Sequence, residues 1–209
     1  MESYITVSKI STAQYSEKRS KFVATLTPCQ NEAQALNIIS QTKNRCFDAR
    51  HNAYAYILKD STAKFSDDGE PHGTAGKPIF DVLSGSGIVD AVIVVTRYFG
   101  GVLLGTGGLV RAYSGAAKGA VESAEIIQMC NCVSVSIECD YTHYSKLSAL
   151  AVKYGAVIEN TEFTNKISLS LRIRSVDFDD FKNDLRDAFS SKLSIKDQKS
   201  VFSPMNLKK

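Results

Sequence analysis

The chain has 209 residues, a length that fits one large or two small domains, each able to bury an apolar core. Hydrophobic residues make up 44% and charged residues 22%, a composition typical of a globular protein and not of a disordered one. The net charge of +3 is smaller than dedicated DNA-binding domains usually carry, so nucleic-acid binding would depend on a local basic patch.

The sequence suggests neither a membrane span nor a disulfide framework. No apolar run approaches the roughly 18–20 residues that a span requires, and no apolar segment follows a basic start. We therefore expect a cytoplasmic protein that does not enter a membrane. The cysteines are odd in number and form no CxxC pair. Cys130 and Cys132 would face the same side of a strand as small buried hydrophobes.

Hydrophobic periodicity predicts an α+β arrangement for a first domain, residues 1–130. The predicted strands cover residues 20–28, 52–58 and 90–96, with an additional one near 4–10. The predicted helices run from a cap at Asn31 toward Lys43, from Pro78 to Leu83, and from the glycine-rich segment to about Ser123. Residues 65–78 are rich in Gly, Pro and Asp, which predicts a long surface loop.

The pattern restarts in a second domain, residues 131–209. Strands are expected at 133–139, 157–163, 167–173 and from Leu193 and Ile195 onward, with helices at 144–154 and 178–189. Gly155 is expected to end the first of these helices. The order β-α-β-β-α-β predicts a ferredoxin-like fold, with two helices on one face of an antiparallel sheet.

A glycine-rich segment, residues 97–111, joins the strand at 90–96 to a helix. The free N–H groups of Thr106 to Leu109 and the positive end of the helix dipole suit an anion such as phosphate or carboxylate. Arg97 and Arg111 could add bidentate contacts to such an anion. The glycines concerned are Gly100, Gly101, Gly105, Gly107 and Gly108.

The same segment matches neither common phosphate-binding template. It lacks the Gly-Lys-Ser/Thr of a Walker A loop, and Val110 stands where a dinucleotide fingerprint has its third small residue. The alternative is a tight turn that lets the helix pack closely on the sheet. Both interpretations stay open at this point.

Polar residues cluster in two further segments, 48–54 and 66–76. Carboxylates and imidazoles are suitable ligands for a divalent cation or groups for acid–base work, but His51 and His72 lack a recognised metal-ligand spacing. Ion pairs between Asp67 or Glu70 and Arg50, Arg97 or Arg111 are the favoured alternative. We therefore predict no metal and no other cofactor. The candidate residues here are Arg50, His51, Asn52, Asp67, Asp68, Glu70 and His72.

No serine or cysteine lies in a recognised nucleophile motif, which favours a protein that is not an enzyme. Arg111, Lys118, Arg172 and Arg174 could contact nucleic-acid phosphates or simply form a solvated face. A single sheet can bring the three polar segments to one region. We therefore hypothesise one ligand-binding surface formed by the residues just named from 48–54, 66–76 and 97–111.

Four blocks together resemble the IMPACT/YigZ family: residues 48–56, 66–76, 94–101 and 105–113. The resemblance covers about residues 15–125, and the rest is similar to the second domain of the bacterial YigZ branch. It implies a first domain like the second domain of ribosomal protein S-five and a ferredoxin-like second domain similar to the last domain of elongation factor G. Both agree with the fold predicted from periodicity.

The resemblance also implies a role in translation. Eukaryotic members of the family look like translation regulators that bind the activator of a starvation-responsive kinase through an additional N-terminal domain. We hypothesise a non-enzymatic, translation-associated protein that binds RNA, the ribosome or a translation-factor partner. The alternatives are an enzyme or sensor that binds a phosphorylated small molecule or divalent metal in the same cleft, and a pure protein-interaction module.

Overall fold

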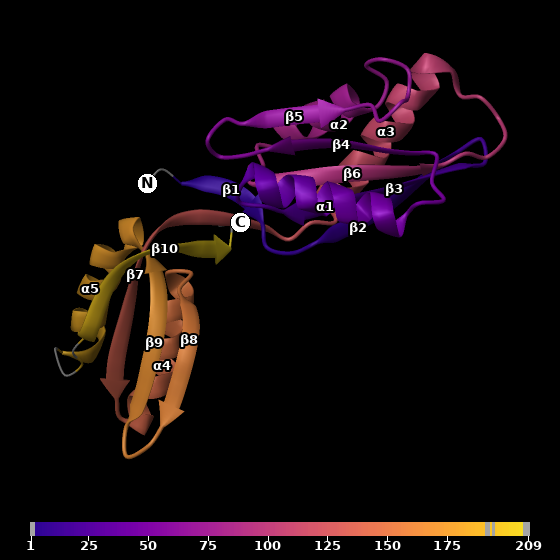
Figure 1. Cartoon of the computed structure of the whole chain (residues 1–209). Coiled ribbons are helices and arrows are strands. Elements are labelled where there is room, and N and C mark those ends of the chain that lie inside the picture. The colour runs from indigo at the N-terminus through magenta and orange to yellow at the C-terminus, as the bar shows by residue number, and fades with distance from the viewer. Residues whose placement is uncertain (1–2, 191–192, 194, 207–209) are drawn as a thin grey trace. The chain divides into compact units, whose positions relative to one another are not determined.

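The computed structural model describes residues 3–190, 193 and 195–206, which divide into two compact units. The N-terminal unit spans Tyr4–Ile127, and the C-terminal unit is formed mainly by the residues from Gln128 onward. Each unit combines helices with an antiparallel arrangement of strands and has its own apolar core (Figure 1). The chain is therefore an α+β protein of two domains.

Five strands form the sheet of the N-terminal unit, in the order β2-β3-β6-β4-β5 with antiparallel neighbours. The central strand β6 is buried from Ala91 to Arg97, as its continuous apolar run predicts. The five strands are β2 (Ser11–Glu17), β3 (Ser20–Pro28), β4 (His51–Ile57), β5 (Ala63–Ser66) and β6 (Ala91–Tyr98). Strand β1 (Tyr4–Val7) also belongs to this unit but is not part of this sheet.

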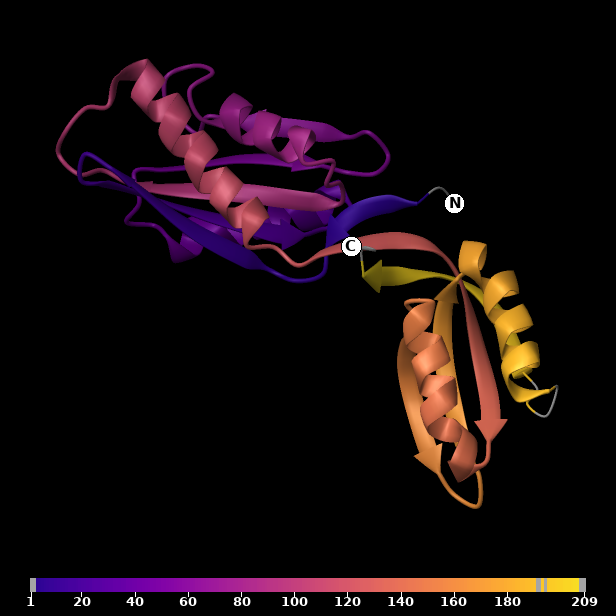
Figure 2. The same ribbon diagram turned by 180° about the vertical axis from the view of Figure 1, so that it is seen from behind.

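Helices cover both faces of this sheet: α1 (Glu32–Arg45) lies on one face, and α2 (Gly76–Gly85) and α3 (Gly105–Glu122) lie on the other (Figures 1 and 2). Successive side chains of β6 point to opposite faces of the sheet. Ile93 therefore packs in the core under α2 and α3, and Val94 packs in the core under α1. The predicted cap of α1 is confirmed, since the Asn31 side chain accepts the N–H of Gln34 at 2.9 Å.

Two parts of the N-terminal prediction were wrong. Strand β2 was missed, because its residues are largely polar and it pairs along only one edge, with β3. Residues 65–78 are not one surface loop: they begin in β5 and end in α2, and Glu70 and Thr74 between them are buried. A polar segment can be buried when its polar groups find partners within the protein. Here Asp67 accepts the N–H groups of Gly73, Ala75 and Gly76.

The predicted β-α-β-β-α-β order of the C-terminal unit is confirmed. Its strands lie in the order β10-β7-β9-β8, and both helices pack on one face of the sheet (Figure 2). The helices and this face share one apolar cluster. Gly155, at φ +62°, follows the first helix as predicted. The elements are β7 (Ile126–Cys139), α4 (Tyr141–Lys153), β8 (Val157–Phe163), β9 (Ile167–Arg174), α5 (Ser175–Phe189) and β10 (Ile195–Asn206).

Strand β10 changes the interpretation of two arginines. Arg174 is buried and donates to the carbonyl of Asn206, while Arg172 pairs with Glu159 at 3.0 Å and donates to the Ser203 hydroxyl at 2.6 Å. Their proposed place on a solvated basic face was therefore wrong, because sequence periodicity does not show what a distant strand covers. Cys130 and Cys132 do face the same side, with sulfur atoms 3.7 Å apart in a buried cluster. None of the helices in the described segments is long and apolar enough to cross a membrane.

Candidate ligand site

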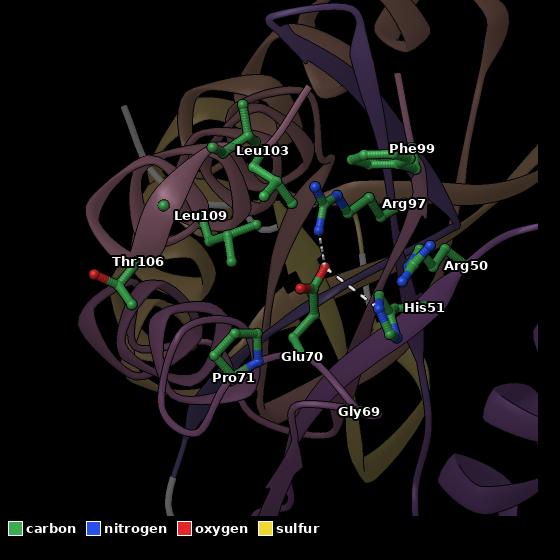
Figure 3. A pocket seen from close by; sticks show the side chains of 12 residues that line it. Arg50, His51, Gly69, Glu70, Pro71, Arg97, Phe99, Leu103, Thr106 and Leu109 are labelled. Carbon is green, nitrogen blue, oxygen red and sulfur yellow. Dashed lines mark hydrogen bonds and ion pairs between the residues drawn. The ribbon is translucent and has the colours of Figure 1, made fainter. Parts of the chain in front are cut away.

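A cavity of about 360 Å³ lies where β4 begins and β6 ends. His51 faces Arg97 across these strands, and the N–H of Arg50 donates to the carbonyl of Arg97 at 3.0 Å. The segment after β5 and the first turn of α3 form the opposite wall (Figure 3). Three segments that are separate in sequence thus meet around one cavity. The predicted site residues that line it are Arg50, His51, Glu70, Arg97, Gly105 and Thr106.

A buried ionic centre forms the floor of the cavity. Glu70 Oε1 accepts hydrogen bonds from Arg97 Nη1 at 2.6 Å and from the Tyr113 hydroxyl at 2.8 Å. The three residues are 8%, 5% and 0% exposed, respectively. Burial, together with the negative charge of Glu70, raises the pKa of Tyr113, so its hydroxyl stays a donor. The expected pairing of Glu70 with an arginine is confirmed, and the partner is Arg97.

The Arg97 side chain is held between two aromatic rings. Its guanidinium carbon lies 5.5 Å from the ring centre of Phe22 and 5.5 Å from that of Phe99. Its Nε is buried and has no hydrogen-bond partner among the described residues. Desolvating two charges costs free energy that their attraction only partly offsets, so a buried pair contributes little net stability.

His51 is oriented by a main-chain group. Its Nδ1 lies 2.7 Å from the carbonyl oxygen of Asp68, and because a carbonyl can only accept, Nδ1 must carry the proton. Its other ring nitrogen, Nε2, lies 4.0 Å from Glu70 Oε1 (Figure 3). The ring therefore presents one polar atom beside the carboxylate at the cavity wall.

The remaining polar candidates hold the walls in place and lie outside the cavity. Asn52 accepts from the Thr96 hydroxyl at 2.7 Å, and its N–H donates to Asp68 at 2.6 Å. Asp68 also forms an ion pair with Lys43. Burial tends to raise the pKa of Asp67, but hydrogen bonds from three backbone N–H groups outweigh it and lower that pKa. His72 is exposed. No cluster of metal-ligating side chains occurs in the described part of the chain.

The glycines explain how the segment before α3 turns so tightly. A Cβ on Gly100 would lie 2.1 Å from the carbonyl carbon of Arg19, so this position needs a residue without a side chain. Gly101 and Gly105 have φ values of +83° and +71°. Close packing is therefore established here, although it does not exclude anion binding. Gly107 and Gly108 lie in the first turn of α3 and outside the cavity lining.

Arg111 lies outside the cavity lining but close to the same turn of α3. It is exposed, and a Cβ placed on Gly107 would lie 3.7 Å from its Nη1. Its guanidinium thus reaches back toward the start of the helix. Arg111 belongs to the surface around the cavity and is free to contact a ligand that extends beyond it.

The apolar lining was not predicted as part of the site. Phe99 and Leu103 are 40% and 83% exposed, and Leu109 forms part of the wall. Large apolar side chains exposed within a glycine-rich segment could have indicated a binding surface. The prediction considered only polar and glycine residues. Tyr113 was likewise missed, although it lies in one of the motif blocks.

The structure defines a two-domain α+β protein whose first domain carries a small, mainly apolar cavity around a buried Arg-Glu-Tyr centre. Residues 18–121 match the model of the Impact N-terminal domain, and residues 137–192 match a domain of unknown function (DUF1949). The candidate cavity and its ionic centre lie within the first of these matches.

Relatives match over most of the chain. An IMPACT family member of Haemophilus influenzae is 35% identical, over 85% of this chain and 88% of the relative. IMPACT family member YigZ of Escherichia coli is 31% identical, over 90% of this chain and 94% of the relative. A crystal structure described as a hypothetical protein is similar, with a TM-score of 0.61 and 30% identity over 93% of this chain and 97% of that one. The chain therefore belongs to the IMPACT family.

Proposed function

We propose that this protein acts in translation, in the cytoplasm, and that its N-terminal unit binds single-stranded RNA with the surface around the cavity. Membership of the IMPACT family supports the link to translation, because the family's eukaryotic members look like translation regulators. RNA binding requires a basic patch. Because the whole chain carries a net charge of only +3, such a patch must be local.

One arrangement carries the proposal: the Arg50 guanidinium lies 5.4 Å from the centre of the Phe99 ring, and both side chains are exposed at the cavity. Single-stranded nucleic acids bind where bases can stack on an aromatic ring while arginines neutralise phosphates. Arg111 extends the positive charge along the first turns of α3. The combination fits a strand that passes across the cavity.

A fluorescence-anisotropy titration with a short oligouridylate, repeated over a range of salt concentrations, tests this proposal. We expect Arg50→Ala and Arg111→Ala each to weaken binding and to reduce the slope of log affinity against log salt by about 1. Phe99→Ala should weaken binding by about 1–3 kcal/mol, because a stacking platform is lost. Arg97→Ala is less suitable, since it leaves Glu70 buried without its partner.

Two exposed residues away from the cavity lining provide matched controls. Lys118 is on α3, like Arg111, and Phe47 is 85% exposed. Lys118→Ala and Phe47→Ala should leave RNA affinity nearly unchanged. Absence of binding at low salt would contradict the proposal, as would losses in the control variants equal to those at Arg50 and Phe99.

A further inference from the structure

We infer that the cavity takes one ribonucleotide unit, with a ribose hydroxyl at Glu70, the base against Phe99 and Leu103, and the phosphate at the start of α3. The inference rests on the proposed function, because it names the part of the RNA that this surface holds. The same unit could also arrive as a free nucleotide. Three features of the cavity support a nucleotide as the ligand.

The first feature is an acceptor at the cavity floor. Arg97 and Tyr113 both donate to Glu70 Oε1. The other carboxylate oxygen, Oε2, lies on the side of the carboxylate away from Arg97 (Figure 3). The Glu70 side chain is only 3% exposed. This oxygen offers a ligand in the cavity a hydrogen-bond acceptor. Since Arg97 already balances the charge, a neutral hydroxyl suits this oxygen better than a second cation does.

The second feature is positive charge on two walls of the cavity. Gly105 and Thr106, at the start of the 18-residue helix α3, line the cavity, and Leu104 at the N-cap has no side-chain acceptor for the first N–H groups. Arg50 also lines the cavity, on the facing wall where β4 begins. With Glu70 balanced by Arg97, these groups leave the cavity attractive to an anion such as phosphate.

The third feature is the apolar wall between these polar ends. Phe99 and Leu103 present exposed apolar surface, and Leu109 and Pro71 continue the wall (Figure 3). A volume of about 360 Å³ is near the lower end of the range for small-molecule sites. One nucleotide has a group for each of these features. Its flat base suits the apolar wall, its ribose hydroxyls can donate to Glu70, and its phosphate suits the positive charge. Inorganic phosphate alone would leave the apolar wall uncovered.

Isothermal titration of the full chain with AMP, GMP, CMP and UMP tests the inference. For the nucleotide that binds most tightly, we expect the 2′,3′-dideoxy monophosphate and the unphosphorylated nucleoside each to bind about tenfold more weakly or worse. Inorganic phosphate should bind more weakly than the nucleotide. Equal affinity for the nucleotide and its dideoxy analogue would overturn the role of Glu70.

Cavity variants add a second measurement. Thr106 is exposed at the cavity, so Thr106→Trp should fill the space and lower nucleotide affinity at least tenfold without disturbing the core. Thr106→Val, which is close in size to threonine, is the matched control and should retain binding. Glu70→Gln should reduce the preference for the nucleotide over its dideoxy analogue. Thermal melting of each variant checks that it is folded.

Titrations with short RNAs distinguish whether the nucleotide in the cavity belongs to an RNA strand or is free. If 5′-phosphorylated RNA binds about tenfold tighter than 5′-hydroxyl RNA, and Thr106→Trp removes the difference, the cavity takes an RNA end. If both bind equally and Thr106→Trp weakens both, it takes an internal nucleotide. If only free nucleotides bind, the inference holds and the proposed RNA function is wrong. If RNA binds, nucleotides do not and Thr106→Trp has no effect, the inference is wrong and the RNA function stands.

Discussion

Each unit contains a cation, a carboxylate and a tyrosine hydroxyl joined in the same way. In the N-terminal unit, Arg97 and Tyr113 donate to one oxygen of Glu70. In the C-terminal unit, Lys153 and Tyr154 donate to one oxygen of Asp184, at 2.6 and 2.7 Å. The hydrogen bonds are nearly equal in length, but the side-chain exposures of the ionic partners are 6% and 3% in the first and 65% and 39% in the second.

The difference in burial changes what the two groups can do. Burial is the largest cause of the raised pKa of Tyr113, whereas the hydrogen bond to Asp184 is the largest cause of the raised pKa of Tyr154. An exposed pair is weakened by solvent and salt, so the Lys153 group acts as a surface contact between α4 and α5. The buried Glu70 group keeps its electrostatic strength and faces a cavity. Similar hydrogen bonds are therefore buried beside a cavity in the N-terminal unit and exposed in the C-terminal unit.

Removal of the two carboxylates should separate these groups most clearly. Glu70→Ala leaves the Arg97 charge buried without compensation, and we expect it to lower the free energy of unfolding by about 3–5 kcal/mol. Asp184→Ala should shift the urea midpoint very little, because its partners remain solvated. Urea unfolding followed by circular dichroism measures both. Equal effects would show that burial is not what distinguishes the two groups.

The double variant Glu70→Leu with Arg97→Met tests whether the buried pair serves binding or stability. Replacing both charges by apolar groups of similar size is often neutral for stability. We expect the double variant to recover part of the stability lost in Glu70→Ala, because the Tyr113 hydroxyl still lacks its acceptor, and to bind no nucleotide. A double variant that is as unstable as Glu70→Ala would assign the pair a structural role.

The two tyrosines should give the next largest contrast. Tyr113→Phe removes a donor from a buried carboxylate, which we expect to cost about 1–3 kcal/mol. Tyr154→Phe removes an equally short hydrogen bond at the surface and should leave the urea midpoint nearly unchanged. Thermal melts of both variants beside the unchanged protein provide the measurement. A larger loss in Tyr154→Phe would contradict the explanation from burial.

Sequence periodicity predicted most of the fold because most elements show one clear apolar pattern. The alternation over 20–28 and the apolar run over 90–96 identify β3 and β6, and residues 144–154 identify α4. Strand β2 was not predicted, because Ser11–Glu17 is an edge strand with few large apolar residues. The segment 65–78 was misassigned because hydrogen bonds to Asp67, invisible in the pattern, allow polar chain to be buried.

The candidate site was predicted less completely than the fold. Polar residues in three segments indicated a shared surface, and one expected ion pair is present between Glu70 and Arg97. Which carboxylate lines the cavity could not be predicted, because Asp67, Asp68 and Glu70 look alike in sequence. Only the path of the loop turns Asp67 toward backbone N–H groups and Glu70 toward the cavity. The role of Phe99 likewise depends on which loop residues remain exposed.

The smallest effect concerns pH and the exposed group. Hydrogen bonds from Lys153 and Tyr154 lower the pKa of Asp184, so the group stabilises the fold above the ordinary aspartate pKa of about 4, and the effect is lost as the pH falls through the lowered value. Lys153→Met should therefore have a slightly lower urea midpoint than the unchanged protein near neutral pH, and the two should converge in acid. High salt at neutral pH should also bring them together, because the pair is exposed. A difference that persists in both acid and high salt would mean that the Lys153 side chain stabilises the unit by packing and not by charge.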